Sequence, residues 1–431
     1  MATVSEFCYG ASNESELASV REDRFHAVLC ATMNFDQKFF DAYISKACES
    51  YPETAKAVEI KNRLSPLLLC PEPLRLPRRL KAEAEEIVSA FFALRELPKR
   101  SRKLEELEPT APDPGNSSIL MSYDFHVDEG GKLRLIEINT NASLSLLTEL
   151  SYETMNIENE FSSSFRSEIF KSFMEEWQLA KIRATERPQA IAITDEDPEK
   201  QKLFIEFLFY KELFEKNGIE TQIVDAKTFS FTDGTLKHED RNIDLVYNRH
   251  TDFYFETENT RALRSAQLAR AACISPNPHE YRLLADKERL LELSRPGAIE
   301  ALDLTSEQKS AISSTLIRTL ETKDFADPDT LWKERKKWFF KPKRSFGGKA
   351  TYRGSSMSRN AFAGVVAGEF LAQEYVPAPV VKRGEPAEDF KYDLRFYVYR
   401  DKIQIACARI YQGQMTNSQT PGGGLAPLIW D

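Results

Sequence analysis

The stretch that most constrains the fold is Tyr123–Ser143, whose sequence is YDFHVDEGGKLRLIEINTNAS. Two apolar-rich runs flank Gly130-Gly131, which is typical of a β-hairpin. A hairpin folded symmetrically about these glycines sets Asp124 directly across from Glu137, and Asn139 falls on the same face because side chains alternate along a strand. Facing carboxylates repel each other, so we expect a cation between them, and three oxygen donors suit Mg²⁺ with phosphate as a further ligand. The alternative is that they are ordinary surface residues of an antiparallel sheet.

The other face of this hairpin is expected to pack in the core. The same alternation points Phe125, Ile136 and Ile138 inward, whereas Leu133 and Leu135 lie on the side of the carboxylates. A bulge near the glycines would shift the register and change this assignment.

Length and charge bound what the chain can do. A chain of 431 residues is long enough for about two or three domains. The net charge of −9 gives no reason to expect a nucleic acid or an anionic membrane as partner. The six cysteines lack the spacing of a zinc site or a disulfide framework, and the N-terminus lacks the apolar core of a signal peptide. We therefore expect a cytoplasmic protein.

Four regions follow one another along the chain. Residues 1–115 show helical periodicity without a motif, which predicts an N-terminal helical lid or support and leaves a role in substrate specificity open. Residues 116–186 contain the hairpin and the helices after it. Residues 187–278 alternate short buried strands with a helix, which predicts an open, mainly parallel sheet that binds substrate. Residues 279–431 contain the remaining strands, lysines and glycine-rich turns.

Two basic residues stand out in the middle of the chain. Arg249 ends the predicted strand Asp244–Arg249, and ligands on parallel sheets bind beyond the carboxyl ends of strands. Arg249 therefore either contacts a ligand or forms a structural ion pair. Lys287 lies within the predicted helix 279–294, in the middle of its leucine stripe. It either extends along the apolar surface to solvent or reaches a phosphate across the core.

The basic segment Lys333–Gly354 predicts a strand at Trp338–Lys341, a flexible turn and a return strand. Backbone N–H groups of Gly347 and Gly348 can close around an anion, and Lys341 adds charge. This pattern is that of a phosphate cradle, although a hairpin that binds nucleic acid or a solvated loop has the same composition.

The last part of the chain adds a short strand and a second hairpin. In the strand, Glu374 can receive an exocyclic amine, and the backbone at Tyr375 and Val376 can meet the edge of a purine ring. In the hairpin Lys391–Ile410, a turn centred on Asp401 sets Asp393 opposite Arg409, so a structural ion pair is one explanation of that arginine. Asn417 and the loop Gly422–Gly424 follow, and this loop can approach a ligand closely.

Taken together, these motifs resemble the ATP-grasp superfamily. The hairpin with the E-x-N strand precedes the nucleotide motifs, which is the order of permuted members such as eukaryotic glutathione synthetase. The segments similar to motifs of that family are Glu137–Thr140 (E-I-N-T), Leu245–Arg249 (V-Y-x-R), Glu292–Gly297 (E-L-S-R-P-G), Lys341–Gly348 (K-P-x-R-E-G-G) and Gly422–Ala426.

The sequence departs from that pattern at two places. Ser345 stands where the family has a metal-binding glutamate, so Asp124 is expected to complete the metal site. Met121-Ser122 stand where an arginine is expected, so the resemblance does not extend to recognition of γ-glutamylcysteine.

The resemblance implies an α+β or α/β ATP-grasp fold in permuted order, with an inserted parallel-sheet substrate domain and an N-terminal helical region. It implies an ATP- and Mg²⁺-dependent carboxylate–amine ligase that acts on an amino acid or small peptide through an acylphosphate, and that is able to form a homodimer. Lys287 and Lys341 would hold phosphates. The candidates for orienting the carboxylate and the oxyanion are Arg249, Arg395, Arg409 and Asn417.

Two other classes of protein stay open. The first is an ATP-grasp kinase or a non-catalytic nucleotide-binding regulatory protein. The second is a nucleic-acid-binding protein that uses Lys333–Arg344, which the net charge disfavours.

Overall fold

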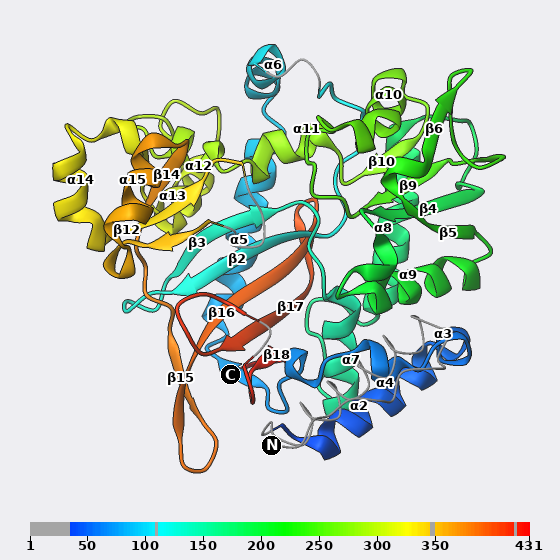
Figure 1. Cartoon of the computed structure of the whole chain (residues 1–431), viewed down its shortest axis with the longest axis horizontal. Helices are drawn as coiled ribbons and strands as arrows, with labels where there is room; N and C mark the ends of the chain where they lie inside the picture. The colour runs from blue at the N-terminus through cyan, green and yellow to red at the C-terminus, as the bar shows by residue number, and fades with distance from the viewer. Residues whose placement is uncertain (1–34, 108–110, 345–349, 418–419) are drawn as a thin grey trace, which may run out of the picture.

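The centre of the molecule is a six-stranded antiparallel sheet of order β18-β17-β16-β2-β3, in which β15 also pairs with β16 (Figure 1). The computed structural model describes residues 35–107, 111–344, 350–417 and 420–431. The two predicted hairpins are therefore neighbours in one sheet. Its strands are β2 (Met121–Val127), β3 (Leu133–Asn139), β15 (Val380–Arg383), β16 (Glu388–Tyr399), β17 (Lys402–Tyr411) and β18 (Gly424–Ala426).

The register of both hairpins agrees with the prediction at the charged positions. Asp124 pairs with Glu137, and Asp393 pairs with Arg409. Directly after Asp124 the register shifts, so that Phe125 pairs with Leu135 and Ile136 is the extra residue of a bulge. The bulge reverses the faces expected beyond it.

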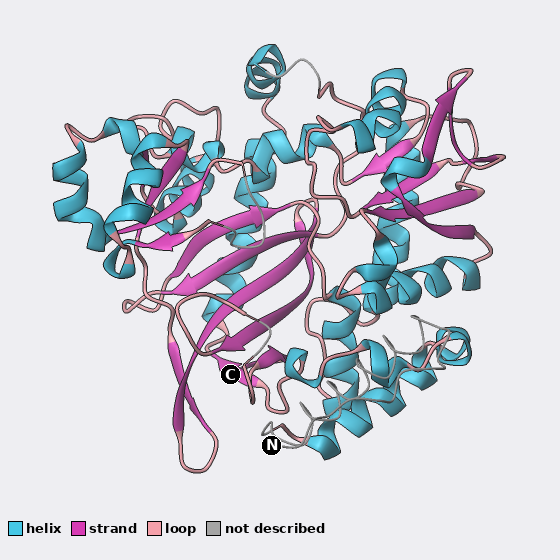
Figure 2. Ribbon diagram, in the orientation of Figure 1, coloured by secondary structure: helices cyan, strands magenta, loops and turns pink. Residues whose placement is uncertain are grey.

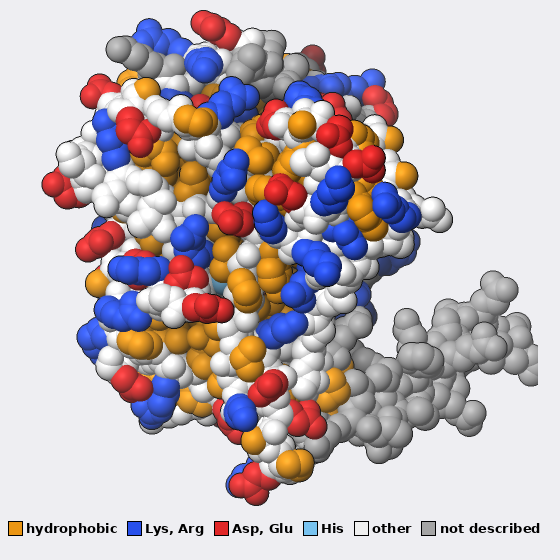
Figure 3. All heavy atoms as spheres, turned by 90° about the vertical axis from the view of Figure 1, so that its left-hand side faces the viewer, with side chains coloured by type: hydrophobic (Ala, Val, Ile, Leu, Met, Phe, Trp, Pro, Cys, Tyr) orange, Lys and Arg blue, Asp and Glu red, His pale blue; other side chains and the backbone are white. Residues whose placement is uncertain are grey.

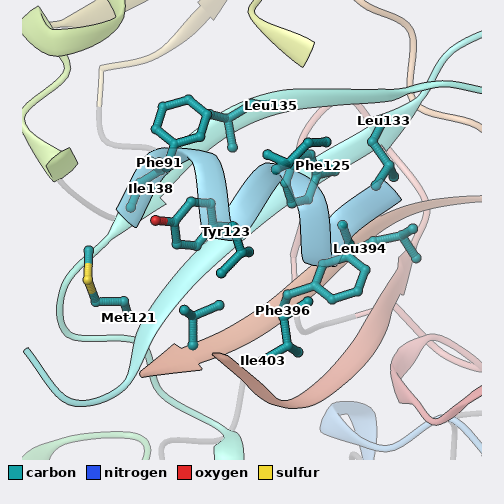
Figure 4. Close-up of a cluster of buried hydrophobic side chains, with 14 of the residues drawn as sticks. Phe91, Met121, Tyr123, Phe125, Leu133, Leu135, Ile138, Leu394, Phe396 and Ile403 are labelled. Carbon is teal, nitrogen blue, oxygen red and sulfur yellow. The ribbon is translucent and has the colours of Figure 1, made fainter. Parts of the chain in front are cut away.

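The expected placement of Ile136, Leu133 and Leu135 was therefore wrong. Leu133 and Leu135 belong to the core beside Phe125, and Ile136 does not (Figure 4). Ile138, on the near side of the bulge, points into the core as expected.

This core forms where helix α5 (Arg79–Arg95) packs on one face of the six-stranded sheet (Figure 4). Phe91 of α5 meets Tyr123 edge to face at 5.9 Å, and Phe125 meets Phe396 in the same way at 5.7 Å. The N-terminal region thus supplies part of the central core. It also supplies β1 (Leu74–Leu76), which pairs in parallel with β19 (Leu428–Trp430) next to the C-terminus.

The opposite face of the sheet is covered by helices. Tyr397, Tyr399, Ile405 and Cys407 point to this side and join a second core. That core includes residues of α2 (Gln37–Ser50), α4 (Ile60–Arg63), α7 (Ser145–Met155), α8 (Phe165–Ala180) and α9 (Phe204–Lys216), with α3 (Pro52–Ala57) beside α2 and α6 (Pro98–Leu107) after α5.

The region after α8 forms the predicted parallel sheet. Its order is β10-β9-β4-β5, and all three pairings are parallel. A three-stranded sheet and α10 (Arg261–Ala269) adjoin it. The strands are β4 (Ala190–Asp195), β5 (Glu220–Asp225), β6 (Phe229–Thr232), β7 (Thr235–His238), β8 (Arg241–Asn242), β9 (Leu245–Asn248) and β10 (Cys273–Ser275).

The antiparallel sheet of order β11-β14-β12-β13 lies on the left in Figure 1 among short helices and forms a separate lobe, the four-stranded lobe. Its strands are β11 (Thr319–Glu321), β12 (Trp338–Pro342), β13 (Tyr352–Arg353) and β14 (Phe370–Glu374). The helices of this part of the chain are α11 (Pro278–Glu280), α12 (Glu288–Leu293), α13 (Ser306–Thr315), α14 (Pro328–Glu334) and α15 (Arg359–Ala367).

The predicted mixed α/β fold class is confirmed, with helices and strands interspersed throughout the chain (Figure 2). The boundaries of the four regions stay a prediction. Among the described residues, no helix is long and apolar enough to cross a membrane.

Glu176 joins three parts of this architecture. Its buried carboxylate accepts hydrogen bonds from Asn116 Nδ2 (2.8 Å) and Ser117 N (3.1 Å) before β2, from Ser275 Oγ (2.7 Å) in β10, and from Tyr399 OH (3.1 Å) in β16. Removing it takes an acceptor from four buried donors, of which Asn116 Nδ2 keeps the carbonyl of Ile274 (3.0 Å) as a further acceptor.

We expect Glu176→Ala to lower the free energy of unfolding by about 3 kcal/mol, because unsatisfied buried donors are costly. Glu175→Ala is the matched control, since Glu175 forms an ion pair with Arg400 at the surface and the loss of this pair costs about 0.5 kcal/mol or less. Urea denaturation followed by circular dichroism measures both variants, and equal losses would contradict the role given to Glu176.

Candidate nucleotide and metal site

The candidate site lies where the four-stranded lobe meets β3 of the central sheet. The carbonyl oxygen of Ile136 accepts hydrogen bonds from Lys341 Nζ (3.1 Å) on β12 and from Gln373 Nε2 (3.3 Å) on β14. Burial lowers the pKa of Lys341, against the opposing effect of Glu137 nearby, and the neighbouring Lys287 lowers it further. The structure thus brings Glu137, Lys341 and Lys287 together from distant parts of the sequence.

Lys287 reaches this place because the helix expected over 279–294 is interrupted, which corrects the sequence prediction. A π-helical turn, Tyr281–Ala285, is followed by Asp286 in an extended conformation, and α12 begins after Lys287. Asp286 Oδ1 accepts a hydrogen bond from Glu288 N at 2.9 Å and so caps the new helix. Lys287 is therefore half-buried at a helix start and does not lie in a continuous apolar stripe.

Asp124 is held by two arginines of the protein itself. Arg395 donates from Nε (2.8 Å) and Nη2 (2.6 Å), and Arg409 donates from Nη2 (3.0 Å). Burial alone would raise the pKa of Asp124, but the two guanidinium groups hold it at about 2. Both carboxylate oxygens of this buried side chain are thus neutralised, and we do not retain Asp124 as a metal ligand.

The two arginines are engaged in the same cluster. Arg409 Nε donates to Asp393 at 2.5 Å, which is the structural ion pair considered from the sequence, and Thr416 Oγ1 also donates to Asp393. Arg395 donates to Asp124 from two of its three guanidinium nitrogens, Nε and Nη2. Their positions therefore serve first to order the sheet, and Arg409, whose side chain is 20% exposed, is the more accessible of the two.

Glu137 and Asn139 remain as oxygen donors for a metal, and both are half-buried. Asn139 Nδ2 lies 3.4 Å from Asp124 Oδ2 and 3.5 Å from Glu137 Oε1, so its amide borders the carboxylate. Within the described residues, no cluster of three or more acidic, histidine or cysteine side chains could hold a metal by itself. This donor set fits one Mg²⁺, which commonly uses one or two protein oxygens with phosphates as further ligands.

The segment Glu374–Val376 follows β14 and leads back toward the central sheet. Tyr375 N donates to Lys337 O at 2.7 Å and Glu374 N to Arg318 O at 2.8 Å, so these two N–H groups are not available to a base. The side chain of Glu374 is exposed. Among the described residues, the N–H of Val376 has no hydrogen-bond partner, which leaves it available to a ligand.

Sequence reasoning missed His126, whose Nδ1 lies 2.9 Å from the carbonyl oxygen of Val376. Alternation along β2 already put His126 on the face of Asp124. The sequence could have revealed this position, but not its partner 250 residues away.

Arg249 and His250 lie beyond the carboxyl end of β9. Because β5 and β9 lie on opposite sides of β4, the topological switch point of the parallel sheet falls between β4 and β9. Arg249 Nη1 donates to the carbonyls of Asn141 (2.9 Å) and Ala142 (2.7 Å), directly after the E-x-N strand. Arg249 Nε and His250 Nε2 are buried without a hydrogen-bond partner among the described residues.

Close backbone packing accounts for two of the glycines in the loop Gly422–Gly424. Gly347 and Gly348 lie outside the described residues. A Cβ on Gly423 would lie 2.5 Å from Ile410 O, and one on Gly424 would lie 2.5 Å from Leu69 N, so close backbone packing requires these glycines. Asn417 is exposed, donates to Gln412 O at 2.8 Å and lines a hollow of about 360 Å³ beside β13.

Ion pairs neutralise part of the basic segment that raised the nucleic-acid alternative. Lys343 Nζ lies 2.9 Å from Glu288 and from Glu321, and Arg344 lies 3.0 Å from Glu256. Figure 3, which views the molecule from the side of this lobe, shows Lys and Arg interspersed with Asp and Glu. This mixed charge, like the net charge of the chain, gives no specific support to a nucleic-acid partner.

Neither the protein-family models nor the curated proteins include a match to this chain. Among solved structures, a glutathione synthetase-like effector, GSS30 of Globodera pallida, matches with TM-score 0.53 and 12% identity over 84% of this chain and 90% of its own. A γ-glutamylcysteine synthetase-like protein of Methylobacillus flagellatus matches with TM-score 0.44 and 11% identity over 81% and 87%. The ATP-grasp ligase PsnB, complexed with minimal precursor, Mg and ADP, matches with TM-score 0.28 and 15% identity over 56% and 88%.

The chain therefore has the fold of the glutathione synthetase-like effector. A relation to the ATP-grasp proteins stays a prediction. The permutation of its strand order stays a prediction.

The stability of variants shows whether Asp124 has a structural role or binds a metal. We expect Asp124→Asn to lower the free energy of unfolding by about 3 kcal/mol without added metal, because it leaves the buried Arg395 without its anion and takes one of two anions from Arg409. Glu137→Gln, at the facing position, should cost less than about 1 kcal/mol. Chemical denaturation in the presence of a chelator measures both.

The control is the free energy of unfolding of the wild-type protein, measured as the pH is lowered. The pKa of Asp124 falls from 3.8 to about 2 on folding, so its stabilisation is present above pH 3.8 and is lost as the pH falls toward 2. This contribution is about 2 kcal/mol and should be missing from Asp124→Asn. An Asp124→Asn variant as stable as the wild type at neutral pH would contradict the assignment.

Proposed function

We propose that this protein is an ATP- and Mg²⁺-dependent carboxylate–amine ligase that acts on an amino acid or small peptide through an acylphosphate. The observation that carries the proposal is the contact of Lys341 with the strand of Glu137 and Asn139, across 205 residues of sequence. Two lysines and the proposed metal-binding residues Glu137 and Asn139 then lie together at the junction of β3 with β12, which we take as the proposed cleft. This is the charge arrangement that phosphoryl transfer needs.

Each residue of the cleft has a task in this reaction. Lys341 and Lys287 neutralise the nucleotide phosphates, and Glu137 and Asn139 hold Mg²⁺. The bound metal would supply charge neutralisation between the phosphates. A carboxylate oxygen of the substrate attacks the γ-phosphorus, and ADP leaves. The amine then attacks the acyl carbon and a C–N bond forms. The acyl C–O bond breaks, phosphate leaves with the electron pair, and the proton of the amine passes to phosphate or solvent.

The nucleotide base fits the segment after β14. The N–H of Val376 can donate to N1 of adenine, and the exposed Glu374 can accept from the exocyclic amine. Tyr375 contributes through its ring rather than its N–H group, which the sheet uses.

The carboxylate substrate fits the switch point of the parallel sheet. Arg249 Nε and His250 Nε2 are buried donors that lack a partner in the described part of the chain, and an anionic acceptor would satisfy both. Arg249 also holds the loop that follows Asn139, so this position adjoins the metal strand. Arg409 and Asn417 remain candidates for the oxyanion, while Arg395 positions Asp124.

A nucleotide-binding protein without ligase activity is the second candidate. It is favoured by the neutralised state of Asp124, which leaves only one carboxylate, Glu137, for the metal. An ATP-grasp kinase is the related alternative. We further propose small-molecule partners, no nucleic acid or membrane partner, a cytoplasmic location and the capacity to form a homodimer.

Two variants test the cleft. Glu137→Gln and Lys341→Met should each lower the turnover of ATP at least a hundredfold, because each removes a charge that faces the phosphates. Lys337→Met is the matched control and should keep wild-type turnover, since Lys337 is exposed and paired with Glu334. ADP release measures activity, and circular dichroism checks the fold. Wild-type activity in either cleft variant would refute the assignment.

A screen of amino acids and dipeptides tests the reaction class. We expect phosphate release from ATP that requires both a carboxylate and an amine, with the condensed product visible by mass spectrometry. Transfer of phosphate to a hydroxyl acceptor would favour a kinase, and tight ATP binding without turnover would favour the non-catalytic protein.

A further inference from the structure

His126 makes a contact that the proposed reaction does not use. It lies on β2, on the face of Asp124, and its Nδ1 is 2.9 Å from the carbonyl oxygen of Val376. Since Leu394 pairs with Phe125, Asp393 occupies the next position of the neighbouring strand, beside His126. The contact therefore joins the central sheet to the segment that leaves the four-stranded lobe.

The chemistry of this contact fixes the form of the imidazole. A carbonyl oxygen can only accept, so Nδ1 carries the proton and donates. Burial lowers the pKa of His126, and Lys341 and Arg409 add to this effect, whereas Asp393 and the Val376 carbonyl oppose it. Burial thus favours the neutral form of the ring.

Val376 is held on both sides of its carbonyl group. Pro377 follows it and restricts its backbone to extended conformations. His126 then fixes the direction of the carbonyl, while the N–H of Val376 is left without a partner in the described part of the chain. The next two N–H groups upstream, of Tyr375 and Glu374, are held by the lobe's own strands and loops.

We propose that His126 is a positioning residue for the nucleotide base: by holding the Val376 carbonyl, it aims the neighbouring Val376 N–H at the acceptor edge of a purine. This inference rests on the proposed function, because it requires a nucleotide in the cleft. It also predicts a preference for adenine, since N1 of adenine accepts a hydrogen bond while N1 of guanine carries a proton.

The test compares a nucleotide with a ligand that has phosphates but no base. For the full-length chain with Mg²⁺, isothermal titration calorimetry measures the Kd of ATP and of inorganic tripolyphosphate. His126→Ala should raise the Kd of ATP about three- to tenfold, as expected for one hydrogen bond. The Kd of tripolyphosphate should stay within twofold, because the lysines and Glu137 are unchanged. His126→Asn, whose Nδ2 can donate in place of Nδ1, should restore ATP binding.

His238→Ala is the matched control, because His238 also makes one hydrogen bond through Nδ1, to Gln222, but in another sheet. It should bind both ligands like the wild type. Unchanged ATP binding by His126→Ala, or an equal loss of ATP and tripolyphosphate binding in both His126 variants, would overturn the inference. A wild-type protein that does not bind ATP would instead contradict the proposed function.

Discussion

The buried cluster of Asp124, Arg395 and Arg409 is the interaction on which the central sheet depends. It connects β2 with β16 and β17, whose residues are 271 and 285 positions further along the chain. Charged groups leave water at a high cost that only close pairing offsets, so the cluster specifies one register for three strands. Asp124 lies on β2, between β16 on one side and β3 on the other. The same register sets Glu137 of β3 opposite Asp124 and so determines where the proposed cleft begins.

The proposed cleft lies where the central sheet meets the sheet of β12 and β14. The carbonyl of Ile136, exposed by the bulge after Asp124, is the point at which Lys341 and Gln373 of the smaller lobe attach. The irregularity in β3 is therefore part of the site, as bulges often are. His126 adds a second attachment at Val376. The four-stranded lobe is therefore held to the central sheet at β12, through Lys341, and at the segment after β14.

Periodicity and turn symmetry sufficed for much of the fold. The pairs Asp124 with Glu137 and Asp393 with Arg409 followed from equal distances to a turn, and the parallel sheet followed from its strand–helix alternation. The bulge at Ile136 and the break at Asp286 could not be read in the same way, because tertiary partners stabilise both. Ile136 offers its carbonyl to another lobe, and Asp286 accepts a hydrogen bond from Tyr254 at 2.6 Å.

The charge environment of the site also depends on tertiary partners that the sequence pattern does not show. Alternation placed Asp124 correctly, but the sequence could not show that Arg395 and Arg409 would neutralise it, since cross-strand neighbours depend on strand order in the sheet. The glycines at 423 and 424 likewise reflect backbone neighbours that are distant in sequence.

Labelling of the lysines by an ATP analogue with a reactive acyl phosphate tests the central claim most directly, that Lys341 and Lys287 face nucleotide phosphates beside Glu137. The probe transfers its acyl group to a lysine near the phosphates, and peptide mass spectrometry locates it. We predict labelling at Lys341 or Lys287 that excess Mg–ATP prevents. Labelling confined to other lysines, or unaffected by Mg–ATP, would contradict the account.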